Sequence, residues 1–383
     1  MRGSVRLRHA TVQRLRSERP GVLELDVLVD EDPADRPPVA EPGLAVAFTQ
    51  LVGRVEVGDR VLVNTTGVAL GLGTGGFHLV VAIDDQAPTD LDHPGRVMKA
   101  RYTPLQVAVE SVEETDRAAL ERSAGLGGRP VVCAPLHSMI GPIAAGARAA
   151  GAERTAYVMS DGAALPGRLS NLVPRLRVAG LLDGFVTSGQ AFGGELEAVT
   201  IWTGVLAAAE LVGADVVIVA DGPGNLGTDT TWGVSALASG HALNAADVLG
   251  GRPVAALRVS FADARERHRG VSHHSLTILD RVCRVAADVA VPVLEGRERD
   301  LVWNSLRKRR LEERYQLVEV DGRPALDELE RAGVEIESMG RTASEDPAFF
   351  LAAGAAGILA GRMAAGSRRW RRAPGEPPAG MRP

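Results

Sequence analysis

Apolar and polar residues alternate one by one in the first part of the chain, a spacing typical of strands that bury one face. The clearest example is VLELDVLV at 22–29, and VEVGDRVLVN at 55–64 adds a hairpin around its Gly-Asp turn. Further β-rich runs at 44–51 and 77–83 complete the set. We therefore predict a small β-barrel or sandwich over residues 1–84.

After Arg129 the pattern changes to short, continuous apolar runs separated by stretches of helical length. The predicted strands are 131–134, 155–159, 184–187, 215–220, 253–260, 289–294 and 316–320, and the helices between them are 138–150, 165–179, 195–212, 232–249, 275–287 and 297–314. Continuous strands joined by crossover helices imply a parallel sheet with both faces covered. The predicted fold class is therefore α/β, with a doubly wound, mostly parallel, Rossmann-like sheet over residues 129–340.

The other segments have weaker patterns. Residues 85–128 are predicted to be a connector with a short acidic helical segment, because they hold several prolines and few apolar periods. An alanine-rich helix at 347–362 is expected to pack on the body within a segment spanning 341–365. The basic, proline-rich tail at 366–383 is predicted to be disordered.

Composition excludes several classes of protein. Two cysteines rule out a disulfide framework, and a net charge of −5 argues against nucleic acid as the main partner. No apolar run approaches the length of a membrane span and the N-terminus lacks a secretory signal, so we expect a cytoplasmic protein without a membrane partner. Lys99 and Lys308 are the only lysines, and neither lies in a predicted site loop, which argues against lysine-based chemistry.

Polar residues follow the predicted parallel strands at their carboxyl ends. His137 follows the first strand, Asp161 the second and Asp221 the fourth, while the connections from helix to strand are short and plain. Since the carboxyl ends of parallel strands gather at one edge, where ligands bind in such sheets, these side chains are predicted to converge. For His137 and Asp161 a local role as a cap or a turn residue stays open.

The loop after the fourth strand contains the pattern G-x-G-x-x-G at Gly222, Gly224 and Gly227, with Asn225 and Thr228 beside it. Such loops bind dinucleotides when a helix follows and an acidic residue ends the next strand, but that strand ends without one. Three interpretations remain open: a dinucleotide site, a backbone cradle for a phosphate or carboxylate, and a purely structural turn.

The densest group of chemical side chains follows the fifth strand, in SFADARERHRGVSHHSLT at 260–277. His268, His273 and His274, with Asp263, could bind a metal such as zinc, iron or manganese. Alternatively, one histidine is a general base and arginines such as Arg265 and Arg269 hold an anionic substrate. The structural alternative is that Ser272 caps a helix while the arginines pair with acidic residues at the surface.

Longer stretches of the sequence resemble a known family. They are LHSMIGPIAAG, YVMSDGAALP, AFGGELEAV, VIVADGPGNLGT and, most specifically, RVSFADARERHRGVSHHSLT. They are similar to the bacterial family called domain of unknown function 3866, from near the N-terminal barrel to about Gly361. The resemblance implies no established activity or catalytic residue, so the functional prediction depends on the residues themselves.

Two functional hypotheses follow from these patterns. In the first, the chain is an enzyme that acts on a small phosphate- or carboxylate-bearing molecule at the carboxyl rim, by acid–base chemistry of His and Asp or with a metal. In the second, the rim senses a metabolite without catalysis and the N-terminal barrel or the basic tail contacts a macromolecule. No particular cofactor or oligomeric state is predicted.

Overall fold

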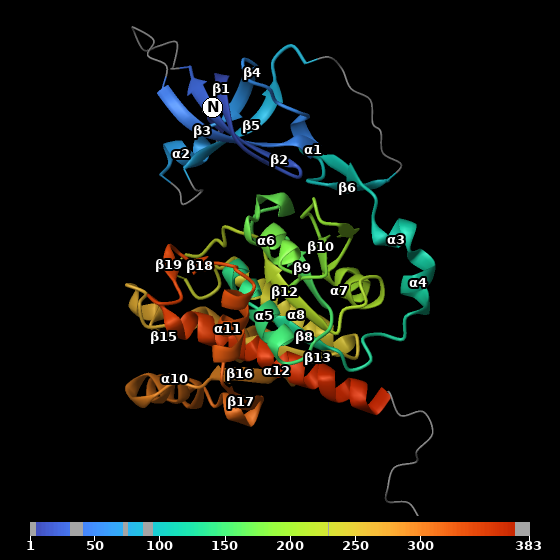
Figure 1. The fold of residues 1–383 in the computed structure, drawn as a ribbon, viewed down its shortest axis with the longest axis vertical. Helices are drawn as coiled ribbons and strands as arrows, with labels where there is room; N and C mark the ends of the chain where they lie inside the picture. Colours follow the sequence, from blue (N-terminus) through green and yellow to red (C-terminus); the bar gives the residue numbers. More distant parts are fainter. Residues whose placement is uncertain (1–4, 31–40, 72–75, 87–94, 229, 372–383) are drawn as a thin grey trace, which may run out of the picture. The chain divides into compact units, whose positions relative to one another are not determined.

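The computed structural model describes residues 5–30, 41–71, 76–86, 95–228 and 230–371. It divides into two compact units (Figure 1), the first formed by residues 1–110 with 166–169 and the second by 111–165 with 170–383. Residues 1–4, 31–40, 72–75, 87–94, 229 and 372–383, which include most of the predicted tail, lie outside the described residues.

The first unit contains a closed barrel of five strands in the order β1-β2-β3-β5-β4. Its elements are β1 (Leu7–Arg19), β2 (Val22–Val29), β3 (Glu41–Phe48), α1 (Thr49–Val52), β4 (Arg60–Asn64), α2 (Thr66–Ala69) and β5 (Phe77–Ile83), followed by the hairpin β6 (Val97–Lys99) and β7 (Val107–Val109). Leu23, Leu25 and Val27 face the interior while Glu24 and Asp26 face outward, so the alternation in the sequence is the inside–outside pattern of the barrel.

The second unit is built on an eight-stranded sheet in the order β11-β10-β9-β12-β8-β13-β16-β17, and every neighbouring pair is parallel. The strands are β8 (Pro130–Cys133), β9 (Thr155–Ser160), β10 (Gly184–Ser188), β11 (Leu196–Ala198), β12 (Val216–Asp221), β13 (Arg252–Ala256), β16 (Asp288–Pro292) and β17 (Gln316–Val320). The prediction of a doubly wound α/β fold with an N-terminal barrel is confirmed.

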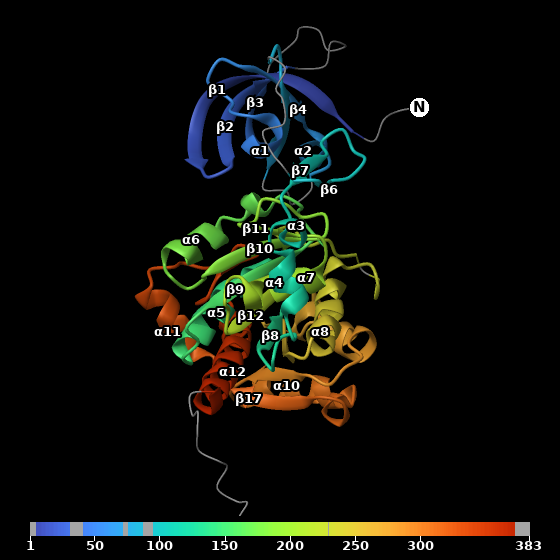
Figure 2. The same cartoon turned by 90° about the vertical axis from the view of Figure 1, so that its right-hand side faces the viewer.

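Helices cover both faces of this sheet, and Figure 2 shows α5, α6 and α11 on one side of the strands and α7 and α8 on the other. The helices are α3 (Val112–Thr115), α4 (Arg117–Arg122), α5 (Ile140–Ala149), α6 (Leu172–Val178), α7 (Ile201–Glu210), α8 (Ala238–Val248), α9 (His273–Thr277), α10 (Gly296–Lys308), α11 (Arg323–Arg331) and α12 (Pro347–Arg371). Along β12, Val217 and Val219 pack against the layer that contains α7 and α8, while Val216 and Ile218 pack against the layer that contains α5, α6 and α11. Burial on both faces explains the uninterrupted apolar runs.

Several predicted boundaries were wrong. The run 195–212 starts with the short strand β11 rather than a helix, and the predicted strand 253–260 divides into β13 and the two-residue β14 (Val259–Ser260). β14 pairs antiparallel with β15 (Gly270–Val271), so the chain doubles back between the two strands. A further hairpin, β18 (Glu337–Ser338) with β19 (Arg341–Thr342), precedes α12.

The C-terminal helix α12 is longer and more apolar than expected. It continues to Arg371, so residues 366–371, assigned to a disordered tail, are helical, while 372–383 lie outside the described residues. The stretch Pro347–Gly366 is long and apolar enough to cross a membrane, contrary to the sequence analysis, but 78% of its most apolar window is buried within the protein. The stretch is therefore a core helix of the second unit.

Small residues let α12 pack tightly on α5. An added Cβ at Gly357 would overlap the carbonyl group of Ile143, and one at Gly146 would lie 2.6 Å from the carbonyl oxygen of Gly354. The two backbones are therefore so close that a methyl group fits at neither position.

We expect Gly357→Ala to lower the free energy of unfolding by about 1–3 kcal/mol, because the new methyl group forces the two helices apart. The matched control is Gly366→Ala on the same helix, where a Cβ meets no atom within 4 Å. That change should be neutral or stabilise the protein by about 0.5–1 kcal/mol through helix propensity. Urea unfolding measures both, and equal effects of the two substitutions would contradict the packing argument.

Candidate functional site

Asp221 lies at the carboxyl end of β12, directly opposite Ser160 at the end of β9. Its side chain is buried, with one carboxylate oxygen accepting a hydrogen bond from Ser160 Oγ at 2.5 Å and the other from Asn225 Nδ2 at 2.9 Å. Gly162 makes room for it, because a Cβ at that position would come within 3 Å of the carboxylate. The site is thus built where two adjacent strands end.

The surroundings of Asp221 raise the pKa of its carboxyl group. Burial is the main cause, and the negative charge of Asp161 adds to it. Hydrogen bonds from Ser160, Ser235 and Asn225 offset part of the effect. A carboxyl group with a raised pKa holds its proton closer to neutral pH, as a side chain that transfers protons needs to do.

Asp161 itself is exposed and has a local structural partner. Its Oδ2 accepts a hydrogen bond from the backbone N–H of Gln190 at 2.8 Å. Gly189, next to Gln190, has a φ of +67° and lies too close to the carboxylate to carry a side chain. Asp161 therefore fixes the loop after β10 and adds negative charge near Asp221.

His137 lies at the start of the helical segment after β8 and contacts Tyr157, Ser170 and the backbone of Asp221. The Tyr157 hydroxyl donates to the backbone carbonyl of Asp221 at 2.9 Å, so Nδ1 of His137, 3.2 Å from that hydroxyl, carries a proton and donates to it. Nε2 then accepts a hydrogen bond from Ser170 Oγ at 2.8 Å. Burial lowers the pKa of His137 to about 4, which agrees with this neutral form.

The loop Gly222–Thr228 connects the Asp221 network to neighbouring elements. The amide of Asn225 also donates to the carbonyl of Pro135 at 3.3 Å and to Ser235 Oγ at 3.1 Å. Thr228 bonds through both its backbone N–H and its hydroxyl to the carbonyl of Gly233, which folds the loop back on itself.

This loop differs from a dinucleotide-binding turn. The first helical turn after it begins at Ser235, seven residues beyond Thr228, so the glycines do not open a helix. Gly224 has a φ of +82°, which the turn requires, and Gly222 packs against the carbonyl of Ala164. The geometry favours the turn and cradle interpretations over a dinucleotide site.

Three histidines lie close together in the segment that follows the strand predicted at 253–260. His268 ends a short 3-10 turn, and His273 and His274 form the first turn of α9. The centroids of His273 and His274 are 4.2 Å apart, and those of His268 lie 5.1 and 4.9 Å from them. One ring nitrogen from each histidine lies within 4.8 Å of the other two.

Ser272 organises this histidine cluster. It is fully buried and caps α9 by accepting the backbone N–H of His274 at 3.3 Å, and its Oγ is 2.8 Å from Nδ1 of His268. The capping role considered in the sequence analysis is therefore present, together with a direct contact to a second histidine. Burial lowers the pKa values of His268 and His274 to about 3, with smaller contributions from neighbouring cationic groups.

Asp263 binds two arginines beside the histidine cluster. Arg258 donates to its Oδ2 at 2.9 Å, and Arg265 donates to both oxygens at 3.0 and 2.9 Å. Although burial acts to raise it, the hydrogen bonds and charges of these arginines hold the pKa of Asp263 well below its usual range. Asp263 is therefore an ionised partner of arginine within the protein, rather than at its surface as the structural alternative assumed.

Further side chains that were not predicted from the sequence support this region. Ser260 Oγ donates to Asp346 at 2.6 Å, and Arg341 forms an ion pair with the same carboxylate at 3.3 Å. Arg258 interrupts an otherwise apolar strand, which is a usable sequence signal for a buried charge. Arg341 and Asp346 are about 80 residues away along the chain from Ser260 and Asp263 and have no local signal.

The structure brings the candidate residues into two neighbouring groups. One group is Asp221 with Asn225, and the other is the histidine cluster with Arg265. The two groups meet at the Gly222–Thr228 loop, because a Cβ on Gly227 would lie 3.4 Å from Cε1 of His274. His137 faces Tyr157 and Ser170 instead, and Arg269 is exposed.

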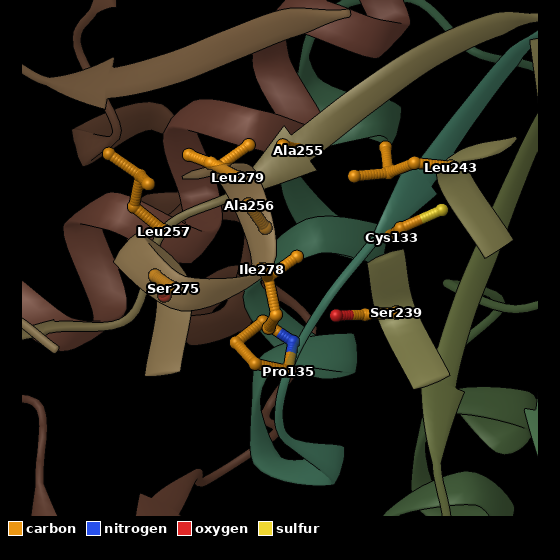
Figure 3. Close-up of a pocket in the computed structure, with 10 residues that line it drawn as sticks. All are labelled: Cys133, Pro135, Ser239, Leu243, Ala255, Ala256, Leu257, Ser275, Ile278 and Leu279. Atoms are coloured by element: carbon orange, nitrogen blue, oxygen red, sulfur yellow. The ribbon is translucent and has the colours of Figure 1, made fainter. Parts of the chain in front are cut away.

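A small apolar cavity lies behind α9 (Figure 3). It has a volume of about 10 Å³, roughly that of one water molecule, and Ile278 and Leu279 of the following turn line it with Cys133 and Pro135. It is too small for a substrate and belongs to the packing that anchors α9. A wider hollow of about 320 Å³ near Pro174 is lined by none of the candidate residues.

We expect the free energy of unfolding to fall as the pH is lowered from 6.5 towards 4, in part because His137 is held neutral in the folded protein. Above about pH 6.5 the histidine is neutral in both the folded and the unfolded protein, so its contribution to stability is fully kept. As the pH falls from 6.5 to the folded pKa, the unfolded chain binds a proton that the folded protein does not. This lowers the free energy of unfolding by about 2–3 kcal/mol at pH 4.5. Urea unfolding of His137→Gln at pH 7 and pH 4.5 should show a smaller decrease than the wild type. His241→Gln, which changes an exposed histidine, should keep the full decrease.

Comparison with known proteins identifies the family but no activity. No curated protein matches the chain. Residues 44–357, which form most of the sequence and include every candidate residue described above, match the family described as "Protein of unknown function (DUF3866)". The resemblance found in the sequence motifs is thereby confirmed, and the chain belongs to this family.

Proposed function

We propose that the protein is an enzyme acting on a small phosphate- or carboxylate-bearing molecule at the carboxyl rim of its parallel sheet. The chemistry would be acid–base transfer by histidine and aspartate side chains or metal-assisted reaction. The single observation that carries the proposal is the Gly222–Thr228 loop, which bonds to Asp221 through Asn225 and packs against His274 through Gly227. One loop thus connects a buried carboxyl group to a buried imidazole.

The charges around the histidine cluster support an anionic substrate. Arg258, Arg265 and Arg267 are near enough to lower the pKa values of the imidazoles of His268 and His274. Arg265 is the accessible member, with 41% of its side chain exposed, and a guanidinium has five N–H donors. Its exposed N–H groups can bind an anion while the side chain stays bound to Asp263.

Asp221 supports the catalytic part of the proposal. Its raised pKa and complete set of hydrogen-bond partners match a side chain that accepts or releases a proton in a dry environment. A buried carboxyl group with a raised pKa is a feature that proton-transferring side chains share. The enzyme hypothesis is therefore favoured over the non-catalytic sensing or macromolecule-binding module.

The proposed partner is a small molecule, with neither nucleic acid nor membrane involved, and the proposed location is the cytoplasm. The net charge of −5 is unfavourable for phosphate backbones. The apolar stretch of α12 is already buried within the protein.

We expect at least one anion from a panel of inorganic phosphate, pyrophosphate, simple carboxylates and phosphorylated metabolites to raise the melting temperature saturably. At about 100 times its Kd an anion stabilises a folded protein by about 2.7 kcal/mol. Arg265→Gln should abolish most of this shift because it removes the accessible guanidinium. Arg117→Gln, which removes an exposed arginine from α4, should leave it unchanged.

For an anion identified in this way, Asp221→Asn should retain binding and lose turnover, because the amide keeps the shape and cannot transfer a proton. A panel without any saturable shift, or equal shifts in the two arginine variants, would contradict the proposal.

A further inference from the structure

We propose that His268, His273 and His274 form a site for one divalent transition metal ion, with zinc as the ion whose ligand preference they match. The inference deepens the proposed function and rests on it for the substrate, but the metal site itself depends only on the three side chains. Imidazole nitrogen is the usual ligand of zinc, and three histidines with an open fourth position are a known arrangement of catalytic zinc.

The distances are compatible with a bound ion. One nitrogen of each ring lies within 4.8 Å of the other two. Zinc–nitrogen bonds of about 2.0–2.1 Å in tetrahedral geometry place ligand nitrogens about 3.4 Å apart. The rings must therefore move together by about 1 Å, which small rotations about their side-chain bonds can supply.

His274 has an unsatisfied nitrogen inside the protein. Only 6% of the residue is exposed, and its Nε2 has no hydrogen-bond partner among the described residues. A buried polar nitrogen is normally paired, because removing it from water without a partner is unfavourable. A metal ion at the centre of the cluster would satisfy this nitrogen.

Ser272 supplies the support that metal-binding histidines usually have. Its Oγ is 2.8 Å from Nδ1 of His268 and already caps the helix that carries His273 and His274. When Nδ1 donates its proton to Ser272, the lone pair of Nε2 is available for a metal. One buried hydroxyl therefore orients one ligand directly and fixes the helical turn of the other two.

Asp263 does not belong to the ligand set that the sequence suggested. Its oxygens bind Arg258 and Arg265, so within the described residues three imidazoles remain as candidate ligands, fewer than the four positions of a tetrahedral ion. An open position is typical of catalytic rather than structural zinc sites. The bound metal would lower the pKa of a water molecule there and polarise an oxygen of the substrate.

The neighbouring arginines make metal and anion binding interdependent. The positive charges of Arg258, Arg265 and Arg267 repel a divalent cation, and a bound anion would weaken that repulsion. A bound anion should therefore increase the affinity of the protein for the metal, and a bound metal should increase its affinity for the anion. The two affinities must increase by the same factor.

The test uses the whole 383-residue chain. Its zinc content is measured by elemental mass spectrometry as purified, after removal of metal with a chelator and after titration with Zn²⁺. Co²⁺ then serves as an optical probe, because its visible absorption becomes much stronger when the protein holds it in tetrahedral coordination. We expect about one ion per chain. Adding inorganic phosphate should increase the measured affinity for the metal.

The variants separate ligands from supporting residues. His273→Gln and His274→Gln should each abolish stoichiometric binding and the cobalt band, whereas Ser272→Ala should weaken the affinity by about 10–100-fold. His241→Gln, on the exposed side of α8, should bind as the wild type does. Circular dichroism checks that each variant is folded, and His273→Gln is the milder change because His273 is less buried than His274.

Absence of stoichiometric metal, or unchanged cobalt spectra in both histidine variants, overturns the inference. Anion-dependent stabilisation of the chelated protein that Arg265→Gln removes would then leave the proposed function standing in its acid–base form. Stoichiometric metal binding without any anion effect would have the opposite meaning, since the metal site would stand and the proposed function would fail.

Discussion

The structure depends on a parallel sheet that is buried on both faces. A parallel strand can join its neighbour only through a crossover, so the helices come to lie on both sides and exclude water from the strands. Polar chemistry is then confined to the ends of the strands. Because all eight strands run the same way, their carboxyl ends share one edge. The candidate site lies at that edge because the rest of the sheet has no room for polar groups.

The order of the strands decides which residues meet at the edge. β12 is inserted between β8 and β9, although β10 and β11 precede it in the sequence. This insertion places Asp221 opposite Ser160 and carries the following loop to Pro135 and onto the face of His274. With β12 in any other position, the carboxyl group of Asp221 would lose the partners that bury it.

Buried charge around the histidine cluster has both a structural and a functional consequence. Removing Asp263 alone would leave the buried guanidinium of Arg258 without its carboxylate partner, which is strongly unfavourable. The pair therefore fixes the path of the chain between β14 and α9, where the histidines lie. The same arginines place positive charge beside the histidines, which supports the anionic substrate that we propose.

The sequence by itself determined the class of fold, the N-terminal barrel and the segment that contains the histidine cluster. Apolar runs of strand length and loops dense in polar residues are local features of the sequence. A sheet that is buried on both faces requires such runs, so they can be recognised without knowledge of the fold. It missed β11, whose three residues LEA fit a helix equally well. It also missed Arg341 and Asp346, which reach Ser260 only through the folded chain. Tertiary structure alone decided that His137 turns to Tyr157 while His274 meets Gly227, because strand order and helix packing set those distances and no local pattern encodes them.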